Sequence, residues 1–98
     1  MKIIDKSIDA IEEELEGAKE YTEKYIENKA RGNMARANKY KEMAHDELKH
    51  AEYIRDFAIQ EVDELRAVYQ MPVEVEEKWA HSLKHFMECM GTVRQMLS

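Results

Sequence analysis

The sequence predicts an all-α protein, an antiparallel two-helix hairpin followed by a third, C-terminal helix. Only three glycines and one proline occur in 98 residues, so the residues that usually form turns and loops are scarce. Apolar residues recur at spacings of three and four along nearly the whole chain, which is the period of one helix face. We expect residues 1–98 to form a single domain, because a chain of this length supports one modest core.

The first helix is expected over residues 5–30. Its apolar stripe consists of Ile4, Ile8, Ile11, Leu15, Ala18, Thr22 and Ile26. The pair Gly32-Asn33 follows directly, and these two residue types best tolerate the left-handed conformation that ends many helices. The helix should therefore end just before this pair.

The second helix is expected over residues 34–69 and the third over residues 73–97, with Pro72 between them because proline cannot donate within a helix interior. The two-residue turn before the second helix predicts an antiparallel hairpin. The stripe of the second helix is Ala37, Tyr40, Ala44, Glu47, Ala51, Ile54, Ala58, Val62 and Leu65. That of the third, in near-heptad register, is Trp79, Leu83, Phe86, Met90, Val93 and Leu97.

Charge and composition exclude several classes of partner. Lysine and arginine number 15 against 21 acidic residues, a formal net charge of −6 without a basic patch, so nucleic acid is not an expected partner. No apolar run approaches the roughly 20 residues that a membrane span needs, and the acidic N-terminal segment does not resemble a signal peptide. The single cysteine, Cys89, excludes an internal disulfide. We expect a cytoplasmic protein.

Two glutamates interrupt the apolar stripes, Glu14 in the first helix and Glu47 in the second. An unpaired carboxylate is costly to bury, so each needs a compensating partner. His50 follows Glu47 by three residues, which places both side chains on one helix face. A Glu-x-x-His motif facing a glutamate on a neighbouring helix is the ligand arrangement of carboxylate-bridged di-metal bundles, since carboxylates bridge two hard cations and an imidazole completes each coordination sphere.

Other histidine motifs are interpreted as solvated surface. Glu42 and His45 have the same spacing but fall on the charged side of the second helix. In the third helix, His81, His85 and Glu88 share a face away from the aromatic residues. Two histidines four residues apart can bind zinc or iron, yet this pattern has little specificity. We therefore expect neither group to form the main site.

Counting ligands predicts the assembly. A complete di-metal site needs four carboxylates and two histidines from four helices, whereas one chain supplies only Glu14, Glu47 and His50. Two copies related by a twofold axis supply the full set. We therefore expect a homodimer that forms a four-helix bundle with the site at its interface. The ligand set alone leaves iron and manganese both open as the metal.

The stretch from Glu13 to Tyr53 resembles the ferritin-like superfamily, and most of all the encapsulated ferritins. The run Glu13-Glu14-Leu15-Glu16, followed by Tyr21, is similar to the first-helix motif of that family. The run from His45 to Ala51, reading HDELKHA, is similar to the second. The family's tryptophan-like position just before the tyrosine is Glu20 here.

This resemblance implies a half-ferritin hairpin that dimerises into the ferritin-like bundle, with dimers assembling into a ring. It further implies that Glu14, Glu47 and His50 are ligands of a di-iron ferroxidase centre. The acidic residues Glu13 and Glu16 would draw ferrous ions toward it, and Tyr21 would lie beside the ligands as a further catalytic residue.

The function expected from these residues is oxidation of ferrous iron by dioxygen or peroxide, in iron handling or detoxification. An encapsulin shell is a partner of that family, whose members carry a C-terminal targeting peptide after the helices. This chain is expected to end at Met96-Leu97-Ser98 inside an amphipathic helix, which counts against a shell. Two alternatives stay open. One is a ferritin-like structural or interaction protein with no turnover. The other is a peroxide scavenger of rubrerythrin type, although the rubredoxin cysteines are missing.

Overall fold

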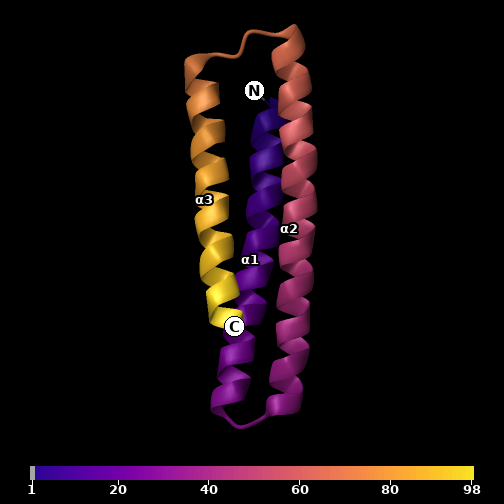
Figure 1. Cartoon of the computed structure of the whole chain (residues 1–98), viewed down its shortest axis with the longest axis vertical. Coiled ribbons are helices and arrows are strands. Elements are labelled where there is room, and N and C mark those ends of the chain that lie inside the picture. Colours follow the sequence, from indigo (N-terminus) through magenta and orange to yellow (C-terminus); the bar gives the residue numbers. More distant parts are fainter. Residues whose placement is uncertain (1) are drawn as a thin grey trace.

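The computed structural model describes residues 2–98 as three long α-helices (Figure 1). They are α1 (Lys2–Ala30), α2 (Met34–Val68) and α3 (Val73–Leu97). No strand occurs among these residues, so the predicted all-α class is confirmed. The helices lie along one direction and form a rod 55 Å long and 18–19 Å across. Within the described part of the chain, no helix is long and apolar enough to cross a membrane.

A tight turn joins α1 to α2, so that the two helices run in opposite directions (Figure 1). Gly32 has a φ of +80°, a conformation that costs glycine little because it has no Cβ. The amide of Asn33 donates to the carbonyl of Asn28 at 2.9 Å, and that of Gly32 to Lys29 at 3.1 Å, the hydrogen-bond pattern of a Schellman motif. The Asn33 side chain then accepts from the amide of Arg36 at 3.1 Å and caps α2.

A short connection containing Pro72 leads from α2 to α3, and α3 begins at the residue after this proline. The carbonyl of Pro72 accepts from the amides of Val75 and Glu76 at 3.1 Å each, which satisfies donors that a helix start leaves free. α3 then runs back in the same direction as α1 (Figure 1). The backbone of α1 lies close to both α2 and α3, so α1 is the central helix of the arrangement.

One apolar core runs along the rod, and the apolar stripes of all three helices contribute to it. The stripe of α1 differs from the expectation at its end, because Tyr25 is 5% exposed whereas Ile26 is 41% exposed. Alternating steps of four and three keep a stripe on one side of a 3.6-residue helix. Thr22 lies four residues after Ala18, so the next residue on the buried side lies three residues further on, at Tyr25, and not four residues further on, at Ile26. The expectation of a buried Ile26 was wrong for this reason.

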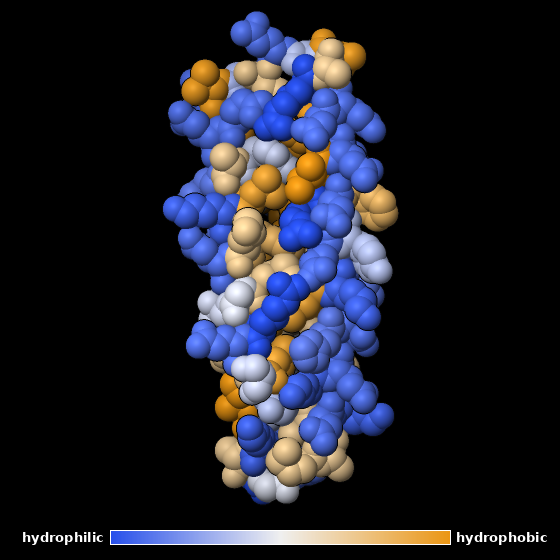
Figure 2. All heavy atoms as spheres, viewed as in Figure 1, coloured by the Kyte–Doolittle hydropathy of each residue, from blue (hydrophilic) through white to orange (hydrophobic). Residues whose placement is uncertain are grey.

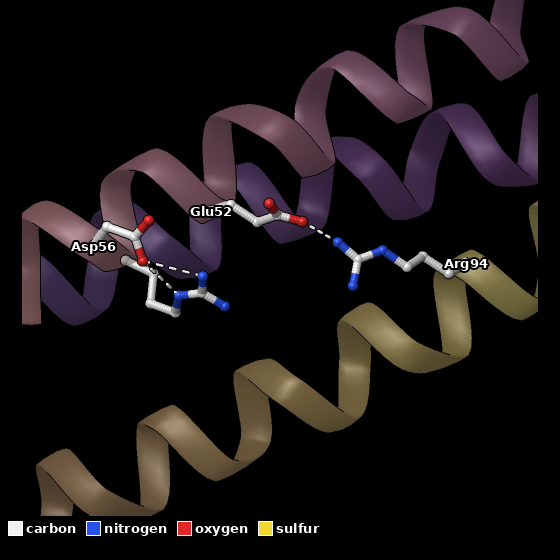
Figure 3. Close-up of polar contacts among 4 residues, drawn as sticks. Glu52, Asp56 and Arg94 are labelled. Carbon is white, nitrogen blue, oxygen red and sulfur yellow. Dashed lines mark hydrogen bonds and ion pairs between the residues drawn. The ribbon is translucent and has the colours of Figure 1, made fainter.

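Ion pairs connect α3 to the other two helices. The Arg66 guanidinium of α2 donates to the Glu76 carboxylate of α3 at 2.6 and 2.8 Å. Arg94 of α3 donates to Glu52 of α2 (Figure 3), and Lys78 of α3 donates to Asp5 of α1 at 2.6 Å. On this side of the rod, apolar side chains form a band along the boundary between α2 and α3, flanked by hydrophilic ones (Figure 2). On this side of the rod, α3 packs along α1 and covers it.

Candidate metal centre

Three potential metal ligands converge between α1 and α2. Glu14 extends from α1, and Glu47 and His50 extend from α2; one ligand atom of each lies within 4.8 Å of the other two. The Nδ1 atom of His50 is 3.9 Å from Oε2 of Glu14 and 3.9 Å from Oε1 of Glu47. Within residues 2–98, no other three histidine, cysteine, aspartate or glutamate side chains meet in this way. The structure thus brings together the three residues that the sequence singled out.

Helix periodicity places these residues on the side of the molecule away from α3. Glu14 belongs to a second row of α1 residues, next to the buried apolar stripe. This row also contains Ile3, Ser7 and Ala10, at steps of four and three. These three residues line a groove between α1 and α2 that has a volume of 730 Å³. The remaining lining residues are Lys6, Ile54, Phe57, Ala58, Glu61, Glu64, Leu65 and Val68. The candidate centre therefore lies at mid-length on a face that α3 leaves uncovered; we call it the open face.

The three ligands differ in exposure. The side chains of Glu14 and Glu47 retain 26% and 25% of their accessible surface, whereas that of His50 retains 58%. The two carboxylates are thus mostly enclosed between the helices, and the imidazole lies at the surface. The group is open on one side, where a further ligand from outside the chain could approach.

Glu14 and Glu47 lie close enough to perturb each other. The pKa of the Glu14 carboxyl is raised above its ordinary value of 4.5, first because it shares a hydrogen bond with the Glu47 carboxyl. Partial burial and the negative charge of Glu47 raise this pKa further, and the charge of Glu13 adds to the effect. The His50 side chain acts in the opposite direction. The pair thus has a deficit of positive charge, which a bound cation would remove.

Gly17 is a residue of this site that the sequence interpretation missed. It lies three residues after Glu14, and a Cβ atom built on it would be 3.0 Å from Oε2 of Glu47. The Glu47 carboxylate therefore lies in the space that a larger residue would fill. A glycine in the middle of a helix costs stability relative to alanine, and that anomaly was the only signal in the sequence that could have drawn attention to it.

The remaining residues named from the resemblance lie near the group but outside it. Glu13 and Glu16 are exposed on α1. Tyr21 is partly buried and stacks on Tyr40 of α2, with ring centroids 6.3 Å apart and an interplanar angle of 28°. Tyr21 follows Glu14 by seven residues, which is roughly 10 Å along the helix axis. It thus shares the helix face of the candidate ligands at a distance of two turns.

The other histidine motifs do not form a comparable group. Glu42 is exposed and lies 3.7 Å from the Lys39 ammonium, as expected for a solvated face. His81, His85 and Glu88 are exposed on α3. His85 instead approaches Cys89, with Nε2 3.5 Å from the sulfur, and Cys89 is only partly buried.

The donor set fits a divalent transition metal. Two carboxylates supply hard oxygen donors and the imidazole supplies a nitrogen donor, a combination that suits iron, manganese and zinc. Three protein ligands leave coordination positions unfilled, so the group can be half of a larger site. No family model, curated protein sequence or solved structure matches this chain. Its function must therefore be inferred from the site itself.

Proposed function

We propose that two copies of this chain join through their open faces and form a ferritin-like four-helix bundle that oxidises ferrous iron at a di-iron site. The observation that carries this proposal is that one half of such a ligand set, Glu14, Glu47 and His50, converges on a face that α3 does not cover. A full set needs four carboxylates and two histidines. A second copy supplies the other half.

The electrostatics of a single chain support a cation at this position. Two hydrogen-bonded carboxyls with an exposed histidine nearby are unfavourable by themselves when both are ionised, because two like charges in partial burial oppose each other. A divalent ion converts this repulsion into attraction, and it binds the deprotonated carboxylates. Bringing two such pairs together without metal would double the charge, so metal binding and dimerisation should be coupled.

The open face also has the chemistry of an interface between copies. Large apolar side chains on it are exposed in the single chain: Ile3 is 48% exposed, Phe57 61% and Val68 72%. These side chains line the groove between α1 and α2. Its lining also includes Ile54, which lies four residues after the candidate ligand His50 on α2. Large exposed apolar patches mark interaction sites, and a patch that adjoins the half-set of ligands favours a second copy of the same chain.

The chemistry follows from the roles of the side chains. Glu47 would lie between two metal positions, and Glu14 and His50 would complete the coordination at one position each. The iron supplies redox chemistry: two ferrous ions lose one electron each, and dioxygen takes up both electrons with two protons to give hydrogen peroxide and two ferric ions. The chain would hold the two ions with Glu14, Glu47 and His50 of each copy, and metal binding would require the Glu14–Glu47 pair to be deprotonated. The same ligand set would accept manganese.

Ferrous oxidation in air, measured by the absorbance of the ferric product, tests the proposal. Glu47→Ala should reduce the initial rate to that of the buffer, because it removes the central carboxylate. Glu42→Ala is the matched control, since it removes a glutamate of the other Glu-x-x-His motif that is exposed and paired with Lys39; its rate should equal that of the wild type. Equal rates for wild type and Glu47→Ala would instead favour a structural or interaction protein without turnover.

A further inference from the structure

α1 contains one glycine, Gly17, and its backbone does not require glycine. Among the described residues, only Gly32 has a positive φ, so Gly17 adopts an ordinary helical conformation that alanine adopts more readily. What distinguishes the position is its surroundings. A Cβ at residue 17 would lie 3.0 Å from Oε2 of Glu47 and 3.5 Å from its carboxyl carbon, and the first of these distances is tighter than most real Cβ contacts, so the carboxylate would have to shift.

The space at Gly17 determines how the two oxygens of Glu47 are used. Oε2 lies against the α1 backbone at Gly17, while Oε1 points toward Nδ1 of His50 at 3.9 Å. The same nitrogen is 3.9 Å from Oε2 of Glu14. A methyl group at residue 17 would push the Glu47 carboxylate outward by a few tenths of an ångström. Metal–ligand distances tolerate deviations of about 0.2 Å, so this displacement is large enough to disturb the site.

We infer that Gly17 is a positioning residue for Glu47: its missing side chain holds the carboxylate between α1 and α2, where it can share a metal with Glu14 and His50. This inference rests on the proposed function, because it concerns the geometry of the same site. It assigns a role to a residue that has no ligand atom. The glycine weakens α1 locally and improves the arrangement of the ligands.

Gly91 of α3 provides a matched control. It is also a glycine within a helix, it is exposed, and a Cβ built on it meets no atom within 4 Å. Replacing either glycine by alanine should increase helix propensity by the same amount. Only the replacement at residue 17 should disturb metal binding. The comparison therefore separates the effect on the helix from the effect on the site.

The experiment combines anaerobic titration with Fe²⁺ and thermal melting without metal, on wild type, Gly17→Ala, Gly17→Leu and Gly91→Ala. Both alanine variants should melt a few degrees higher, about 2–8 °C, because alanine favours helix. Fe²⁺ affinity should fall about tenfold in Gly17→Ala, the lower end of the usual effect of groups that orient ligands, and further in Gly17→Leu. It should be unchanged in Gly91→Ala. In a Glu47→Ala background, Gly17→Ala should cause no further loss of Fe²⁺ affinity.

Three results would overturn the inference. Wild-type affinity in both Gly17 variants would show that Glu47 does not depend on this space, while the proposed function would stand. A loss of helix content or a lower melting temperature in Gly17→Ala would show that the glycine serves the packing of α1 on α2. A wild type that binds no Fe²⁺ would contradict the proposed function and this inference with it.

Discussion

The side of the molecule that α3 covers and the open face contain similar acidic residues in opposite electrostatic situations. On the side covered by α3, Lys78 lowers the pKa of Asp5, and Arg66 lowers that of Glu76. On the open face, the pKa of Glu14 is raised, first because its carboxyl shares a hydrogen bond with that of Glu47. The covered side thus reaches charge compensation within one chain. The open face does not, which indicates that its partner, a cation or a second copy, comes from outside.

The same contrast extends to the apolar residues, and the two phenylalanines illustrate it. Phe86 on α3 is fully buried, with the Arg55 guanidinium 5.4 Å from its ring centroid. Phe57 on α2 lines the open groove and is 61% exposed. One ring belongs to the core of the single chain. The other is available for contact with another molecule.

The largest expected effect on stability comes from removing the buried ring. Phe86→Ala should lower the free energy of unfolding by about 3–5 kcal/mol, because it loses buried apolar surface and leaves a cavity. Urea denaturation of metal-free protein at low concentration measures this value. A loss below about 1 kcal/mol would show that α3 does not form part of the core, since exposed substitutions cost that little.

Phe57→Ala is the matched variant on the other side. It should change the unfolding free energy of the single chain by no more than about 0.5 kcal/mol, as for other exposed positions, yet reduce the dimer fraction in the presence of metal. Denaturation and native mass measurement on the same samples separate the two effects. A dimer fraction equal to that of the wild type would place the interface elsewhere on the chain.

A smaller effect is expected from pH. Because the folded pKa of Glu14 is raised above 4.5, its contribution to stability is fully present below about pH 4.5 and is lost as pH rises through the folded pKa. Glu76 has a lowered pKa, so its contribution is present above its unfolded pKa and is lost as pH falls through the folded value. The two sides of the molecule thus contribute opposite slopes.

Urea denaturation of metal-free protein across this pH range should resolve the two contributions. Glu14→Gln should remove the loss of stability on raising the pH, whereas Glu76→Gln should reduce the loss on lowering it and leave the part that comes from Asp5. Metal bound to the wild type should abolish the Glu14 contribution, since the ion displaces the proton. If Glu14→Gln has the same pH profile as the wild type, the carboxyl pair is not coupled in solution.

Much of the fold was predictable because it depends on local periodicity and turn chemistry. The Gly32-Asn33 turn and Pro72 delimit helices that have no other interruption. Glu14, Glu47 and His50 could be singled out because two are charged residues within apolar stripes and the third follows at helix spacing. The structure adds the approach of Glu14 to the α2 ligands, with its Oε2 3.9 Å from Nδ1 of His50, which depends on the register of α1 against α2.

Other features could not be predicted, because they depend on contacts between helices. The sequence does not indicate that α3 packs chiefly along α1, and therefore does not indicate which face stays open. The role of Gly17 depends on a side chain of another helix. The raised pKa of Glu14 likewise follows from the approach of Glu47 across the boundary between helices. Periodicity identifies the faces of a helix but leaves their neighbours undetermined.

Anaerobic titration with Fe²⁺, followed by native mass measurement of the assembly, tests whether two half-sites share one metal centre. We expect metal-free protein to be largely monomeric and Fe²⁺ to convert it into a dimer, or a multiple of dimers, with two irons per pair of chains. His50→Ala should weaken both responses. Chelator-treated and iron-loaded wild type with the same mass distribution, or one iron per chain without dimerisation, would contradict a shared centre.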